Sequence, residues 1–158
     1  MTLDEHCKLL GKLVGNFQSL EFILRVFLQE LPSARPMGIP SGTDIYSFPV
    51  GSELPESEMT SYDTLRDLIK KFNIEMDKPG SSTIDVTLVA VRDALAHGRV
   101  SSSTPDDTMP MRLFKFSKPD KKGRVCVVFN EQMTKAWFED QIARVRQAIR
   151  AVYKVMPQ

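Results

Sequence analysis

Hydrophobic residues recur every three or four positions in four stretches of the chain, which is the spacing of one face of an α-helix. The pattern predicts four helices, over residues 3–31, 60–75, 82–97 and 132–155. Thr2 with Glu5 matches a capping box before the first helix, and Pro32 ends that helix. Its apolar stripe consists of Leu10, Leu13, Phe17, Leu20, Leu24, Phe27, Leu28 and Leu31. The second predicted helix has the apolar face Tyr62, Leu65, Leu68, Ile69 and Phe72.

Two short stretches between the third and fourth helices predict a β-hairpin. Its strands are expected over residues 111–117 and 124–129, on either side of a turn that contains Pro, Asp and Gly. The hairpin is an insertion at residues 110–130, and a polar loop over residues 99–107 is expected before it. We therefore predict an all-α fold, an up-and-down bundle of about four main helices with an inserted β-hairpin, in a single domain of residues 1–158.

Residues 32–58 form a long connection between the first two helices. Five prolines and three glycines in this stretch rule out a long helix. Residues 45–48 within it are compatible with a short strand or with a flap over the bundle. Connections of this length in compact domains are often functional or partly disordered.

The third predicted helix is apolar on two sides. Its core stripe consists of Ile84, Leu88, Val91 and Leu95, and its opposite side carries Val86, Val89 and Ala90. Such a helix is expected to be buried on both sides, by the core and by a second subunit, which predicts a homodimer through this helix. Ser82 is expected to cap its start, and Gly98 to cap its end in the left-handed conformation.

Arg92, Asp93 and His97, near the end of this helix, form the candidate catalytic site. Asp93 and His97 are four residues apart, so the carboxylate is expected to orient the imidazole and to favour its charged form. Arg92 is long enough to swing its guanidinium towards a ligand held by His97. A fork of donors beside a titratable imidazole suits a phosphodiester, because arginine binds phosphate oxygens and histidine transfers protons near neutral pH.

The stretch Arg92-Asp93-Ala94-Leu95-Ala96-His97 resembles the motif of the HEPN superfamily (higher eukaryotes and prokaryotes nucleotide-binding domains). That motif is Arg, four to six residues and His, often with Asn, Asp or His directly after the Arg. The resemblance implies an all-helical domain that dimerises along the motif helices and, in many members, metal-independent RNA cleavage. It also implies a toxin–antitoxin or defence setting, with an antitoxin or regulatory protein as a partner.

The leading hypothesis is therefore a HEPN-like endoribonuclease that uses the RNA 2′-OH as nucleophile and leaves a 2′,3′-cyclic phosphate. His97 is assigned as general acid or base, Arg92 as the group that neutralises the phosphorane, and Asp93 as the residue that orients His97 or the RNA. Two alternatives stay open. One is a catalytically silent HEPN-like module that binds RNA, a nucleotide or a protein. The other is a helical dimer in which Arg92 and His97 are structural.

Glu21 is a candidate supporting residue, because it lies near the edge of the first helix's apolar stripe, where a carboxylate needs a partner. A pair with Arg92 would fix the guanidinium. The sequence is equally compatible with Glu21 facing solvent or pairing with Arg25 at the next turn.

The net charge of +1 hides an asymmetry along the chain. Residues 1–91 carry 8 basic and 13 acidic side chains, whereas residues 92–158 carry 13 basic and 7 acidic ones. A basic half is typical of proteins that bind polyanions, although solvated surface charge also produces it. The candidate RNA-binding residues are Arg99, Lys115, Lys118, Lys121, Lys122 and Arg124. Phe114 and Phe116 are interleaved with them and suit base stacking, but the same pattern also protects an edge strand from aggregation.

The sequence predicts neither a cofactor nor a metal site. His6 and His97 are the only histidines, there is no Cys-x-x-Cys, and His6 is expected on the surface. Cys7 and Cys126 are far apart, which argues against a disulfide framework and indicates a reducing, cytoplasmic location. The acidic N-terminus does not resemble a signal peptide, and no apolar run approaches the length of a membrane span.

Overall fold

The computed structural model describes residues 1–40, 42–77, 81–102 and 110–156, which are mostly helical. Its elements, in chain order, are α1 (Leu3–Gln29), the 3-10 helix η1 (Ile45–Ser47), α2 (Leu65–Glu75), α3 (Leu88–His97), β1 (Arg99–Ser101), β2 (Arg112–Phe116), β3 (Val127–Gln132) and α4 (Lys135–Val155). The predicted helices are present, and the expected hairpin is part of a three-stranded antiparallel sheet.

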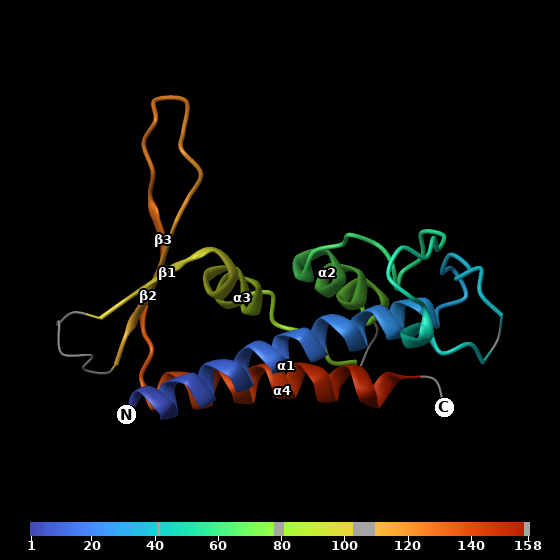
Figure 1. The fold of residues 1–158 in the computed structure, drawn as a ribbon, viewed down its shortest axis with the longest axis horizontal. Helices are drawn as coiled ribbons and strands as arrows, with labels where there is room; N and C mark the ends of the chain where they lie inside the picture. Colours follow the sequence, from blue (N-terminus) through green and yellow to red (C-terminus); the bar gives the residue numbers. More distant parts are fainter. Residues whose placement is uncertain (41, 78–80, 103–109, 157–158) are drawn as a thin grey trace.

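α1 and α4 lie side by side and form one layer of the molecule (Figure 1). Their N-terminal ends are adjacent, because His6 of α1 lies edge-on to Phe138 of α4 with ring centroids 5.2 Å apart. The two longest helices therefore run parallel, whereas the first and last helices of an up-and-down bundle run antiparallel. That part of the predicted fold class is wrong. The reason is that the chain passes from α3 through the sheet, which stands beside the N-terminal end of α1, before α4 begins.

The core lies between this layer and the two shorter helices, α2 and α3, on one side of it (Figure 1). Phe27 of α1 and Phe72 of α2 pack edge to face with ring centroids 5.1 Å apart. The largest fully buried side chains include Leu13, Leu20, Leu24, Leu65, Leu68, Phe72, Leu88, Leu113 and Phe138. Burial of one such side chain stabilises a fold by about 1.5–3 kcal/mol. The predicted apolar stripe of α1 is confirmed from Leu13 to Leu28. It therefore contributes many of the buried side chains that stabilise the core.

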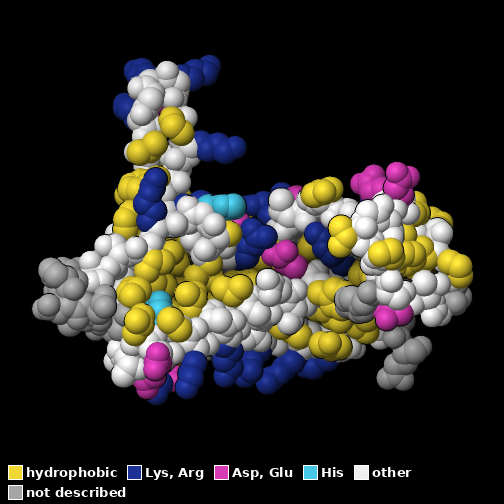
Figure 2. Space-filling view, viewed as in Figure 1, with side chains coloured by type: hydrophobic (Ala, Val, Ile, Leu, Met, Phe, Trp, Pro, Cys, Tyr) yellow, Lys and Arg dark blue, Asp and Glu magenta, His cyan; other side chains and the backbone are white. Residues whose placement is uncertain are grey.

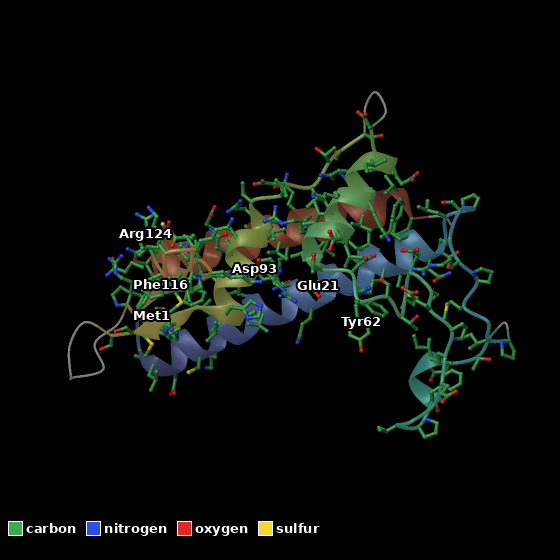
Figure 3. The ribbon with its side chains drawn as sticks, turned by 90° about the horizontal axis from the view of Figure 1, so that it is seen from above. Met1, Glu21, Tyr62, Asp93, Phe116 and Arg124 are labelled. Atoms are coloured by element: carbon green, nitrogen blue, oxygen red, sulfur yellow. The ribbon has the colours of Figure 1, made fainter. Side chains whose placement is uncertain are left out.

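The helix starts follow local capping more closely than hydrophobic spacing. The capping box predicted for Thr2 and Glu5 is present at the start of α1. A second capping box, formed by Thr64 and Asp67, starts α2 later than the spacing predicted. Tyr62 consequently lies before the helix and is fully exposed (Figure 3), instead of joining the apolar face.

α3 begins at Leu88, so the prediction that Ser82 caps it is wrong. The carboxylate of Asp85 accepts hydrogen bonds from the Thr87 N–H at 2.8 Å and from the Thr87 hydroxyl at 2.6 Å. Such local bonds compete with helix formation and hold a turn at this point. Residues 82–87 therefore lead into the helix without joining it.

The later start of α3 changes its two predicted apolar faces. Val89, which was expected to face a second subunit, is only 2% exposed and belongs to the core. Val86 lies before the helix and is exposed. Ala90, within the helix, is also exposed, whereas Leu95 is only partly buried. Val86 and Ala90 are thus the exposed apolar residues near the start of α3.

The strand order of the sheet is β1-β2-β3, and both pairs are antiparallel. The β2–β3 pair confirms the predicted hairpin, although β3 covers residues 127–132 and not 124–129. β1 occupies the start of the stretch predicted as a loop, where Arg99 pairs with Phe114. Three residues are too few for an alternating pattern to show, so the sequence carries no signal for this strand. Residues 103–109 of the predicted loop lie outside the described residues.

The hairpin projects from the helical layers (Figure 1). Leu113 of β2 and Met133, just after β3, are buried and anchor its base in the core. The register shifts between Lys115 and Phe116, an irregularity that bends and twists a strand pair. Several valines beyond the base are exposed, namely Val125, Val127 and Val128.

The described part of the connection between α1 and α2 contains no strand. Residues 45–47 form η1, which corrects the expectation of a short strand there. The connection lies around the C-terminal end of α1 (Figure 1). Arg25 of α1 donates to the carbonyl oxygens of Ser61 and Asp63, at 2.9 and 2.7 Å. This arginine therefore fastens the end of the connection to α1.

His6 is buried, contrary to the sequence-based expectation. Its side chain is 3% exposed, and within the described structure its Nδ1 atom has no hydrogen-bond partner. The parallel packing of α1 on α4 places the ring against Phe138 and removes it from solvent. Burial lowers the pKa of His6, because the charged imidazolium loses its solvation.

The free energy of unfolding is expected to fall as the pH decreases from about 7.5 to 5. Unfolded His6 takes up a proton near its ordinary pKa of 6.5, whereas the folded residue does so only at lower pH. The unfolded state thus binds more protons in this window, which favours unfolding. Urea unfolding at several pH values measures the effect. His6→Leu should show a smaller decrease, and an equal decrease in this variant would assign the pH dependence to other groups.

Candidate functional site

The candidate site lies where α3 crosses α1. The Nε atom of Arg92 is 2.8 Å from the Oε1 atom of Glu21, in an ion pair that joins the two helices. The side chains are 32% and 24% exposed, so the pair stands at the edge of the core. Of the pairings that the sequence left open for Glu21, the structure has the one with Arg92. Arg25, the alternative partner, binds carbonyl oxygens instead.

Asp93 is held by cations on both sides. Its Oδ1 atom is 3.6 Å from Nη1 of Arg92, and its Oδ2 atom is 3.7 Å from Nζ of Lys115 in β2. Figure 3 shows Asp93 and Glu21 on the facing helices α3 and α1. Among the described residues, no hydrogen bond or ion pair joins Asp93 to His97. The expected carboxylate–imidazole contact is therefore replaced by contacts with Arg92 and Lys115.

His97 is exposed in the last turn of α3. It follows Arg92 by five residues, which corresponds to about 140° around the helix and about 7.5 Å along its axis. Arg92 faces α1, so within one chain His97 lies on a different sector of the helix. The two side chains are therefore close in sequence but do not converge on one point of the α1–α3 interface.

A groove of about 300 Å³ runs beside the ion pair, between α1 and α3. Gln18, Glu21 and Arg92 form its polar part, and its apolar lining residues include Val14, Leu95 and Ala96. The guanidinium of Arg92 uses Nε for Glu21 and holds Nη1 near Asp93. Its Nη2 atom forms no hydrogen bond with the described residues, so it can donate to an acceptor that enters the groove.

Gly98 holds the sheet close to the end of α3. Its backbone is extended, with φ −81° and ψ −176°, so the predicted left-handed cap is wrong. A Cβ atom at this position would lie 2.9 Å from the carbonyl oxygen of Phe114 in β2 and even closer to that of Ala94 in α3. Glycine is thus required by the close approach of two backbones. This approach brings β2, and with it Lys115, to the motif.

The predicted RNA-binding residues fall into two groups. Lys115 contacts Asp93, and Arg99 lies over the ring of Phe116 at 5.1 Å from its centroid, so both belong to the base of the hairpin. The remaining residues, Lys118, Lys121, Lys122 and Arg124, lie in the outer part of the hairpin, where Figure 2 shows a concentration of basic side chains. Asp120 accepts from the Arg124 guanidinium at 2.9 Å and partly neutralises this group.

Sequence reasoning missed the contact between Lys115 and Asp93. Lys115 was predicted as a hairpin residue that binds RNA, with no relation to the motif. The contact depends on the three-residue strand β1 and on the close approach of the α3 and β2 backbones at Gly98, and the hydrophobic pattern of the sequence shows neither. The described residues also contain no cluster of three His, Cys, Asp or Glu side chains that could hold a metal ion.

No helix among the described residues is both long enough and apolar enough to cross a bilayer. Cys7 and Cys126 are exposed free thiols.

Comparisons with protein-family models, with curated proteins and with solved structures give no match to this chain. The geometry around Arg92 and His97 is consequently the basis for a functional proposal.

Gly98→Ala and Gly11→Ala should have opposite effects on the free energy of unfolding. Alanine at position 98 would press on the Phe114 and Ala94 carbonyl groups, and overpacking of this kind typically costs about 1–3 kcal/mol. Gly11 faces open space within α1, so alanine there should stabilise by up to about 1 kcal/mol through its helix propensity. Urea unfolding of both variants provides the measurement. A neutral Gly98→Ala would show that β2 is free to move away from α3.

Proposed function

We propose that this protein is a HEPN-like endoribonuclease that needs no metal ion, with Arg92 and His97 as its catalytic residues. The observation that supports this most is the ion pair between Glu21 and Arg92. It fixes the guanidinium at a groove while leaving Nη2 for a phosphate oxygen. Lys115, whose Nζ atom is 3.7 Å from Oδ2 of Asp93, is a second cation beside the motif.

In the proposed reaction, the 2′-oxygen of the RNA attacks the adjacent phosphorus while the bond from phosphorus to the 5′-oxygen breaks. One proton leaves the 2′-hydroxyl and one is delivered to the departing 5′-oxygen, so the products are a 2′,3′-cyclic phosphate and a 5′-hydroxyl. His97 is assigned as general acid or base, because histidine exchanges protons near neutral pH. Arg92 is assigned to the phosphorane, whose added negative charge a guanidinium stabilises.

The proposal includes a homodimer through α3. Within one chain, Arg92 faces α1 and His97 lies on another sector of the helix. A second α3 packed on the exposed Val86 and Ala90 would bring the motif helices of two subunits together. A closed twofold interface of this kind contains two equivalent sites. The toxin–antitoxin setting and an antitoxin partner remain what the motif resemblance implies.

A catalytically silent module that binds RNA is the second candidate. It is favoured by the position of His97 on a different sector of α3 from Arg92, because acid–base catalysis needs the imidazole within hydrogen-bond reach of the phosphate that the guanidinium binds. RNA that binds with the salt dependence of a phosphate contact but is never cut would support this candidate.

Arg92→Ala and His97→Ala should each reduce RNA cleavage in EDTA by at least about a hundredfold. Loss of a transition-state donor typically costs about 10²–10³ in rate, and loss of general acid–base catalysis about 10²–10⁴. Arg92→Lys should also be severely impaired, because an ammonium group cannot reproduce the guanidinium fork. End-labelled RNA resolved on gels measures the rate, and the product should carry a 2′,3′-cyclic phosphate.

Arg66→Ala is the matched control, because Arg66 is an exposed arginine on α2. It should cleave RNA like the parent. Circular dichroism and sedimentation velocity of each variant report the fold and the subunit assembly. Cleavage that requires an added metal ion, or undiminished cleavage by His97→Ala, would contradict the mechanism. A monomer at micromolar concentration would contradict the paired site.

Lys121→Glu with Lys122→Glu should weaken RNA binding and leave the fold intact, since both lysines are exposed in the hairpin turn. If each lysine contacts one phosphate, the plot of log association constant against log salt concentration should become shallower. For single-stranded RNA its slope should lose about 1.4 in magnitude. Fluorescence anisotropy with labelled RNA gives both quantities. The control is Arg66→Glu with Lys70→Glu, which makes the same charge change on α2. Equal affinities for the two double variants would exclude the hairpin turn from the RNA contact.

A further inference from the structure

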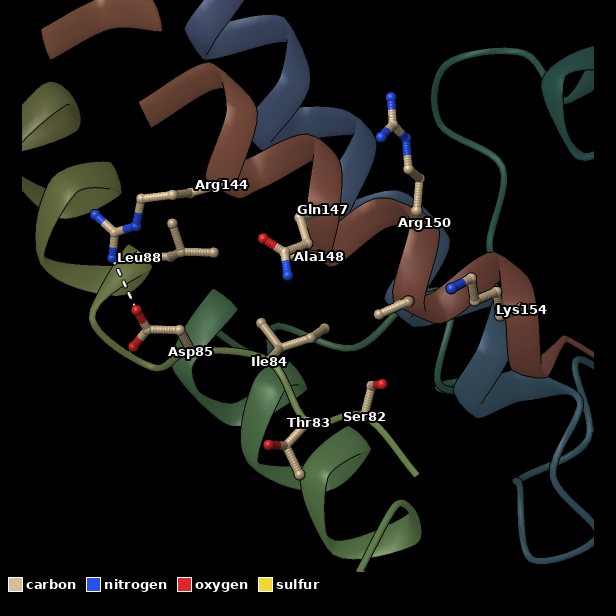
Figure 4. A pocket seen from close by; sticks show the side chains of 11 residues that line it. Ser82, Thr83, Ile84, Asp85, Leu88, Arg144, Gln147, Ala148, Arg150 and Lys154 are labelled. Atoms are coloured by element: carbon tan, nitrogen blue, oxygen red, sulfur yellow. Dashed lines mark hydrogen bonds and ion pairs between the residues drawn. The ribbon is translucent and has the colours of Figure 1, made fainter. Parts of the chain in front are cut away.

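A cavity of about 370 Å³ lies between α4 and the segment that precedes α3 (Figure 4). We call it the α4 cavity. Ser82 and Thr83 line it from the segment, and Gln147, Arg150 and Lys154 line it from α4. None of the motif residues contributes to its lining. Its volume lies within the range of about 300–1,000 Å³ that is usual for small-molecule sites.

The floor of the α4 cavity is apolar and rigid. Ile84, Leu88 and Ala148 line it and are almost completely buried, so they belong to the core of the molecule. Side chains in a packed core keep defined positions. The floor is therefore a preformed apolar surface, of the kind that accepts a flat or aliphatic part of a ligand.

Arg144 closes one end of the cavity, and its charge is already neutralised. Its Nη2 atom donates to Asp85 at 2.8 Å, and its Nη1 atom donates to Gln141 at 2.9 Å. Hydrogen bonds from Thr87, together with this one from Arg144, hold the pKa of Asp85 below its ordinary value. The ionised Asp85 thus cancels the Arg144 charge, and the pair acts as a fixed wall (Figure 4).

Two cations at the other end of the cavity have no counter-ion within the described part of the chain. Arg150 and Lys154 are exposed and form no hydrogen bond or ion pair with the described residues. In Figure 4 the Gln147 amide points into the cavity and the Lys154 amine lies at its rim, whereas the Arg150 guanidinium points outward. Rotation of the flexible Arg150 side chain would bring its guanidinium to the same rim. The hydroxyls of Ser82 and Thr83 belong to the opposite wall.

We propose that the α4 cavity binds a small phosphate monoester that carries an apolar group, such as a nucleoside monophosphate. A phosphate dianion matches the two unpaired cations, and a guanidinium with an ammonium is a common way to bind it. The Ser82 hydroxyl and the Gln147 amide supply neutral hydrogen bonds to the remaining oxygens. The apolar part of the ligand lies on the floor formed by Ile84, Leu88 and Ala148. This site is separate from the proposed nuclease site and does not depend on it.

Isothermal titration of the full chain with AMP, adenosine and inorganic phosphate tests the proposal. AMP should bind more tightly than inorganic phosphate, because only AMP contacts the apolar floor, and adenosine should bind more weakly than AMP because it lacks the phosphate. Lys154→Gln should weaken AMP binding by about tenfold or more, the usual effect of losing one charged hydrogen bond in a binding site. Equal affinities for AMP and inorganic phosphate would overturn the role of the floor.

Arg146→Gln is the matched control, because Arg146 is an exposed arginine on the same helix but does not line the α4 cavity. It should bind AMP like the parent. An equal loss in Arg146→Gln and Lys154→Gln would show general attraction to a basic helix and overturn the proposal, as would no AMP binding by the parent at millimolar ligand. Amide chemical shifts provide a readout of location, since AMP should move the resonances of residues 82–85 and leave those around His97 unchanged.

Discussion

The burial of one face of α1 is the constraint on which the rest of the fold depends. α4 packs along this helix in the same direction, and α2 and α3 cover the other side of its apolar stripe. Because α1 and α4 are parallel, the chain must return to the N-terminal end of α1 before the last helix can begin. The sheet makes this return. The hairpin therefore stands on a connection that the packing of the two long helices requires.

The same packing places the candidate site. Glu21 lies at the edge of the α1 stripe, so its carboxylate meets whatever helix crosses there, and that helix presents Arg92. Ion pairs that are partly open to solvent stabilise a fold by at most about 1 kcal/mol. The pair thus contributes little to the stability of the domain, and its main effect is to give a long, flexible guanidinium a defined direction. The contact between Asp93 and Lys115 continues this series of ion pairs from α3 to strand β2 of the sheet.

Features with local causes could be predicted from the sequence, and features with tertiary causes could not. The capping box at Thr2, the stripe of α1 and the β2–β3 pair follow from short-range patterns. Glu21 was identified as a carboxylate in need of a partner, although its spacing could not choose between Arg25 and Arg92. The burial of His6 depends on the parallel direction of α4, and the contact of Lys115 depends on a three-residue strand. Neither cause is visible in the residues near these positions.

The shift of register between Lys115 and Phe116 divides the hairpin into two parts. The inner part is fastened to the helices by the buried side chains of Leu113 and Met133. Its Lys115 also contacts Asp93 of α3. Residues 118–128 of the outer part are exposed, and only the two sides of the hairpin join it to the rest of the molecule (Figure 1). Its length and charge can therefore change without disturbing the helices or the motif. The hairpin turn is thus the part of the surface where substitutions and insertions are tolerated best, while the helical body stays the same.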